Sequence, residues 1–155
     1  MNDKQLTGNI GLFYACYCLS WYGWNAMPTI RNAKGADIFI VSQDGKKLGI
    51  QVKALSEKPD VFIGENYDDP TVDFWVVLMN VRKDDWPTAY IIPAEHIRAG
   101  VEACKSGIDS IGKLVHSDRP KADGSVACYL STKFLQSGNH QYANAWESIG
   151  QQVIA

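Results

Sequence analysis

Two short apolar runs joined by a polar turn constrain the fold of this chain more than any other feature. The turn contains Asp44-Gly45, a pair typical of a tight connection between antiparallel strands. Because side chains alternate along a strand, Gln51 and Lys53 share one face of the second strand. Asp37 opens the first strand, so the hairpin predicts that a carboxylate, an amide and an ammonium group meet on one patch.

Such a patch has the chemistry of a divalent cation site. Magnesium binds carboxylate and carbonyl oxygens and keeps several of its waters, and Asp37 and Gln51 supply one oxygen of each kind. Lys53 would orient a water molecule or neutralise charge on a phosphate. A simpler interpretation is also open, in which Asp37 ends a turn and the other two residues form the solvated face of an amphipathic strand.

The composition predicts one packed domain spanning residues 1–155. Hydrophobic residues make up 46% of the chain and aromatic residues 11%, which argues against disorder. The formal net charge of −2 gives no support for a basic protein that coats nucleic acid non-specifically. No apolar run is long enough to span a bilayer and the first residues lack the pattern of a signal peptide. We therefore expect a cytoplasmic protein with no membrane partner.

The cysteines and histidines indicate neither a disulfide framework nor a zinc site. The four cysteines include no CxxC pair, and we interpret them as reduced core thiols: Cys16, Cys18, Cys104 and Cys128. The three histidines do not stand at the spacing of zinc ligands, so a structural zinc is not expected.

Hydrophobic periodicity predicts a helix over residues 3–22, ending at Gly23. We expect its buried stripe to consist of Leu6, Ile10, Phe13, Tyr17 and Trp21. Strands are predicted over residues 24–31, 38–41, 48–54, 72–81 and 89–92. Pro28 places the first of these strands at an edge or a bend.

The remaining segments carry weaker signals. Residues 56–71 form a polar loop long enough to suggest a functional role, and Pro93 opens a second helix that runs to about Lys105. The last third of the chain, 106–155, is weakly specified, with a short strand at 126–130 and a last helix at 141–153. The order of elements predicts an α/β fold with a mixed sheet of about five strands flanked by helices.

The hairpin and the helix before it resemble the PD-(D/E)XK nuclease-like superfamily. In that superfamily a helix precedes a three-stranded meander, the second strand begins with the Asp, and the third carries (D/E/Q)-x-K. The matching segments here are Ala36-Asp37 and Gln51-Val52-Lys53. The resemblance implies a restriction-endonuclease-like core and phosphodiester hydrolysis in nucleic acid, with DNA as the expected substrate. It also implies Mg²⁺ or Mn²⁺ held by Asp37 and Gln51, with Lys53 positioning the attacking water.

The same resemblance implies accessory residues near the site. Asn32 and Lys34 lie in the turn before Asp37, and Asn9 is the closest counterpart of a Glu that family members often carry on the first helix. Close helix packing would explain the glycines that flank Asn9 equally well. No acidic residue occurs from residue 5 to residue 35, which leaves Asp37 as the only carboxylate of the expected site.

Three hypotheses about function follow. The first is a metal-dependent nuclease or a nuclease-like DNA-binding protein. The second is a catalytically inactive protein of the same fold, a binding or assembly module that forms a homodimer through its aromatic surface. The third is an unrelated α/β protein in which Asp37 and Lys53 are structural.

Overall fold

The larger of the two sheets has five strands. The computed structural model describes residues 3–30, 34–57, 60–83, 86–107, 113–117, 122–137 and 140–151. The strands, in their order across the sheet, are β1 (Asn25–Pro28), β2 (Ile38–Val41), β3 (Lys47–Ala54), β5 (Phe74–Met79) and β6 (Thr88–Pro93). β3 and β5 are parallel, whereas the other neighbours are antiparallel. The predicted α/β fold with a mixed five-stranded sheet is therefore confirmed.

The β2–β3 hairpin forms where the sequence predicts it. Gly45 has φ +88°, a left-handed conformation that glycine adopts without strain. The Ser42 N–H donates to the carbonyl of Lys46 (2.9 Å) and closes the turn. β1 lies at the edge of the sheet, which agrees with the position of Pro28.

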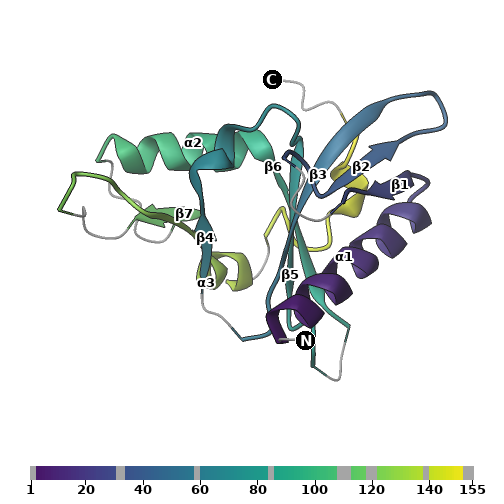
Figure 1. Ribbon diagram of the computed structural model, residues 1–155, viewed down its shortest axis with the longest axis horizontal. Helices are drawn as coiled ribbons and strands as arrows, with labels where there is room; N and C mark the ends of the chain where they lie inside the picture. The colour runs from purple at the N-terminus through teal and green to yellow at the C-terminus, as the bar shows by residue number, and fades with distance from the viewer. Residues whose placement is uncertain are drawn as a thin grey trace.

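Helices cover the two faces of this sheet, as Figure 1 shows. The side chains of β5 alternate between the faces and are all buried, as expected for an interior strand. Phe74, Val76 and Leu78 join the core beneath α1 (Asp3–Trp21). Trp75 and Val77 join the opposite core, which α2 (Ala94–Lys105) covers.

α1 buries the face opposite to the one that the sequence predicts. Its buried residues are mostly small and lie toward β1 and β3: Thr7, Gly11, Ala15, Cys18 and Leu19. The expected burial of the bulky stripe is wrong, because its members are exposed or only half-buried: Leu6, Ile10, Phe13, Tyr17 and Trp21. A Cβ atom on Gly11 would lie less than 3.0 Å from Ala54 Cβ, so small residues let the helix backbone approach β3 closely.

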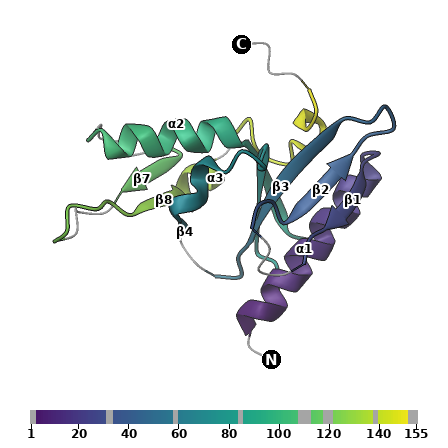
Figure 2. The same cartoon turned by 45° about the horizontal axis from the view of Figure 1, so that its top comes forward.

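A second, three-stranded sheet stands beside the larger one (Figures 1 and 2). Its elements are β4 (Asp60–Ile63), β8 (Cys128–Ser131) and β7 (Val115–Ser117), and α3 (Thr132–Gln136) follows β8. The prediction of one loop over 56–71 is wrong, because that segment contains β4 and the 3₁₀ helix η1 (Glu65–Asp68). β4 alternates buried and exposed residues, a pattern too short to stand out among polar neighbours.

The segment after residue 140 follows the outer edge of β6. Ala143 forms an isolated antiparallel bridge with Tyr90, and the N–H of Asn144 donates to a carbonyl of β6. Asn144 itself has φ +50°, outside the helical region. The predicted helix at 141–153 is therefore wrong over residues 141–151, the part of it that the structure describes. The helical element in this range is the short 3₁₀ turn η2 (Trp146–Ser148).

All four cysteines lie in the described part of the chain, and none of them forms a disulfide. Cys18, Cys104 and Cys128 are buried and Cys16 is half-buried, and burial raises the pKa of Cys16 and of Cys18. Within the described ranges, no helix combines the length and hydropathy that crossing a bilayer requires.

Candidate functional site

The hairpin opens at one end because β3 extends beyond its pairing with β2: the first residue of β2 pairs with Ile50, and β3 runs on to Ala54. The last paired residues are Ile38 and Ile50, and just beyond them the N–H of Asp37 donates to the carbonyl of Ile50 (2.9 Å). From there β3 continues to Ala54 with β5 as its only strand partner among the described residues. The edge of β3 after Ile50 is therefore open to side chains and to ligands.

The Asp37 carboxylate occupies this opening. Its Oδ2 accepts hydrogen bonds from the N–H of Val52 (2.8 Å) and from Gln51 Nε2 (2.6 Å). It thus pairs a backbone donor of β3 that β2 does not reach. Burial raises the pKa of Asp37, and the hydrogen bond from Val52, the charge of Lys53 and the hydrogen bond from Gln51 oppose that shift. A partly desolvated carboxylate of this kind is suited to bind a cation.

Gln51 and Lys53 stand next to β5 on the open part of β3. In the parallel register Gln51 lies opposite Trp75 and Lys53 opposite Val77, and both polar side chains are half-buried. Lys53 Nζ lies 5.8 Å from the centroid of the Trp75 ring, within the range of a cation–π contact. The aromatic ring restricts where the ammonium group can lie.

These side chains line one cleft of about 820 Å³. The residues that the sequence predicts for the site and that line this cleft are Asn9, Lys34, Asp37, Gln51 and Lys53. Asn9 comes from α1 and Lys34 from the segment before β2. Asn32, the remaining predicted residue, lies outside the described residues.

Part of the lining of the cleft comes from residues that sequence reasoning missed. Asn66, Tyr67 and Asp69 belong to the segment predicted as a loop, and all three line the cleft. Asp69 Oδ1 accepts from the N–H (2.8 Å) and the hydroxyl (2.7 Å) of Thr71, and these bonds lower the pKa of Asp69. Asp69 thus adds a second carboxylate to the cleft. In the sequence, the polar composition of residues 56–71 was the one feature that pointed to this segment.

Tyr67 joins this part of the lining to α2. Its hydroxyl donates to Glu102 Oε1 (2.7 Å) and accepts from Lys105 Nζ (3.0 Å). The Lys105 ammonium also lies 4.6 Å from the centroid of the Tyr67 ring. The Tyr67 side chain, which lines the cleft, is therefore held in place by Glu102 and Lys105 of α2.

The donor set fits a magnesium-type ion. Because Gln51 uses Nε2 toward Asp37, its Oε1 remains as the polar atom for a ligand, beside the carboxylate of Asp37. One carboxylate and one amide oxygen suit an ion that keeps its waters and takes further oxygens from a substrate phosphate. Within the described ranges, no cluster of three or more His, Cys, Asp or Glu side chains is placed to hold a metal ion.

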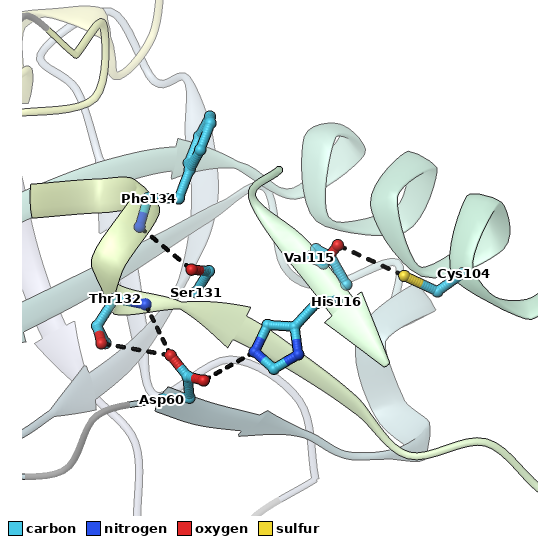
Figure 3. Close-up of polar contacts among 7 residues, drawn as sticks. All are labelled: Asp60, Cys104, Val115, His116, Ser131, Thr132 and Phe134. Carbon is cyan, nitrogen blue, oxygen red and sulfur yellow. Dashed lines mark hydrogen bonds and ion pairs between the residues drawn. The ribbon is translucent and has the colours of Figure 1, made fainter. Parts of the chain in front are cut away.

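A second polar cluster, shown in Figure 3, joins the strands of the smaller sheet. Asp60 Oδ1 accepts from the N–H of Thr132 (3.0 Å), and its Oδ2 lies 2.7 Å from His116 Nε2. The Ser131 hydroxyl accepts from the N–H of Phe134 (3.1 Å) and caps α3. Asp60 therefore joins β4 to β7 and to the first turn of α3, which is a structural role.

The comparisons with known proteins bear on the fold. The chain is similar to the structure of a bacterial homing endonuclease, with a TM-score of 0.55 and 14% identity over 96% of this chain and 92% of that one. The two chains therefore have similar folds. The sequence matches no family model, and no curated protein matches it significantly. At this level of identity the similarity concerns the fold alone.

Proposed function

We propose that this protein is a metal-dependent phosphodiesterase of the PD-(D/E)XK type that cleaves nucleic acid, with DNA as its substrate. One observation carries the proposal: Asp37, Gln51 and Lys53 line one cleft where β2 and β3 separate. The nuclease-like fold agrees with it.

Asp37 and Gln51 would hold the Mg²⁺ or Mn²⁺ ion through one carboxylate oxygen and Gln51 Oε1. The ion would supply Lewis-acid stabilisation of charge on the phosphate. The carboxylate lies in a partly desolvated position, where its attraction for a cation is stronger than in water. The bonds from Val52 and Gln51 fix its orientation in advance.

Lys53 has two roles in the proposed reaction. It positions the water whose oxygen bonds to phosphorus as the ester P–O bond breaks. The attacking water releases a proton to solvent, and the leaving oxygen takes up a proton from solvent. Its ammonium group also stabilises the negative charge that grows on the phosphate oxygens. Trp75 limits the positions open to Lys53. Lys34 lines the cleft where it would contact a neighbouring phosphate, and Asn9 would orient water from the α1 side.

Cleavage assays with the purified chain test the proposal. Double-stranded DNA, single-stranded DNA and RNA are incubated with Mg²⁺, with Mn²⁺ or with EDTA. We expect metal-dependent cleavage of DNA, and we expect Asp37→Ala and Lys53→Ala each to lower the rate by about 100-fold or more. Lys47→Ala is the matched control, because Lys47 is exposed at the start of β3 and outside the residues that line the cleft. Activity that survives both cleft substitutions would contradict the assignment.

A catalytically silent DNA-binding protein is the second candidate. The hydrogen bond from Gln51 to Asp37 favours it, because the two side chains satisfy one another without an ion. A thermal shift with Mg²⁺ or Mn²⁺, alone and with DNA, separates the two candidates. The metal should raise the melting temperature of a nuclease, whereas the melting temperature of a silent DNA-binding protein should not change when metal is added, with or without DNA.

A further inference from the structure

α1 turns a row of large apolar side chains away from the sheet. Ile10, Phe13, Tyr17 and Trp21 follow one another at helical spacing and are 41%, 64%, 60% and 76% exposed. Trp86 widens the row, since it is 78% exposed and its ring stacks on Tyr14 of the same helix at 5.9 Å between centroids. We call this surface the α1 aromatic face; it consists of Ile10, Phe13, Tyr17, Trp21 and Trp86.

The exposure of this face follows from how the helix packs. Gly11 and Ala15 lie on the opposite side of α1, where the sheet lies close beneath the helix. Bulky residues cannot enter that contact, so they point outward. Figures 1 and 2 show α1 on the outside of the molecule, with the sheet on one side of it only.

The size of the face is that of an interface. From the exposed fractions and about 150–250 Å² for each aromatic side chain, the face leaves about 600 Å² of apolar surface in water. The largest apolar patches on monomeric proteins reach about 300–600 Å² and are often functional. A standard protein–protein interface buries about 800 Å² on each partner, most of which this face supplies.

The charge of the face indicates the kind of partner. No Asp, Glu, Lys or Arg occurs from Gln5 to Ile30, so α1 carries no charge beyond its first turn. Nucleic acid and anionic membranes are bound through Lys and Arg, which this surface lacks. An uncharged face meets its own copy without like-charge repulsion, and a two-fold dimer brings the same patch of both copies together.

We infer that the α1 aromatic face is the interface of a homodimer, in which the same face of a second copy docks about a two-fold axis. Burial of these aromatic rings drives association, and Phe13 and Tyr17, in the middle of the row, contribute most. The inference goes beyond the proposed nuclease activity and does not depend on it, because association is measured without nucleic acid or metal.

Sedimentation equilibrium on the full chain tests the inference. We expect the wild-type protein to be dimeric at about 10 µM. Phe13→Glu and Tyr17→Glu should each raise the dissociation constant by about 100-fold, because each places a charge in a desolvated contact. Phe62→Glu is the matched control, since Phe62 is an exposed aromatic residue of the smaller sheet, and it should remain dimeric.

Unfolding does not account for the expected loss of the dimer. Phe13 and Tyr17 are exposed and Glu is a good helix former, so circular dichroism should show folded variants. A wild-type chain that stays monomeric at about 100 µM would overturn the inference. So would a dimer that both substitutions leave intact, or one that Phe62→Glu weakens equally. Binding of the monomer to anionic vesicles or to DNA, abolished by Phe13→Glu, would overturn it in favour of a different partner.

Discussion

The contact between α1 and β3 at Gly11 gives a prediction whose size follows from the structure. A Cβ atom at this position would lie less than 3.0 Å from Ala54 Cβ, whereas carbon atoms in contact stand about 3.5–4.0 Å apart. In Gly11→Ala the helix must therefore move away from β3 by at least about 0.5 Å. Overpacking costs about 1–3 kcal/mol, and this contact falls in the upper part of that range, about 2–3 kcal/mol, because neither Cβ atom can rotate away from the other. The higher helix propensity of Ala offsets about 1 kcal/mol of this cost.

We expect Gly11→Ala to lower the free energy of unfolding by about 1–2 kcal/mol in urea denaturation. For a chain of this size that lowers the melting temperature by about 2–8 °C. The double variant Gly11→Ala/Ala54→Gly removes the clashing methyl group, so its stability should return to within about 1 kcal/mol of wild type. Ser20→Ala, on the exposed side of α1, is the control for helix propensity alone. A Gly11→Ala protein as stable as Ser20→Ala would refute the close contact.

Two further predictions concern acidic residues. Burial raises the pKa of Asp37 above its unfolded value, so the native state binds the proton more tightly and stability falls as pH rises through the native pKa. Asp37→Asn should therefore have a higher free energy of unfolding than wild type at pH 7. The difference should vanish at pH values below the ordinary pKa of a carboxyl group, where Asp37 is protonated in both states. A variant that urea unfolds more easily than wild type at pH 7 would contradict this prediction. Asp60→Ala should cost about 1–3 kcal/mol in urea denaturation by leaving Thr132 and His116 without their partner. Asp60→Asn keeps the acceptor for Thr132 and should lose about half as much; equal losses for the two variants would show that the hydrogen bond from Thr132 does not contribute to stability.

The sequence predicts best where the determinants of structure are local. Asp44-Gly45 specifies a tight turn by itself, so the hairpin and the relation of Asp37 to Gln51 and Lys53 follow without knowledge of the rest of the chain. The convergence of these three side chains could therefore be predicted. Their proposed catalytic roles stay predictions, as does the cytoplasmic location.

The sequence predicts poorly where a long-range contact decides the outcome. Hydrophobic periodicity places α1 correctly along the chain but selects its bulky side as the core side, because the pattern ranks residues by size and apolarity. The close approach of Gly11 to Ala54 reverses that choice. Likewise the segment around Ala143 is not helical, since it pairs with β6, which lies about 50 residues earlier in the chain.

α1 connects the two proposals physically, because its three sides meet three different surroundings. Gly11 lies against β3, Asn9 lines the cleft with Lys53, and Phe13 and Tyr17 belong to the α1 aromatic face. A rigid helix transmits any displacement of its outer side to its cleft side, since its backbone hydrogen bonds keep the three sides in fixed relation. Association through the outer face would therefore restrain the helix that forms one wall of the cleft. It would hold Asn9 in place relative to β3, so dimerisation and order in the cleft are expected to be coupled.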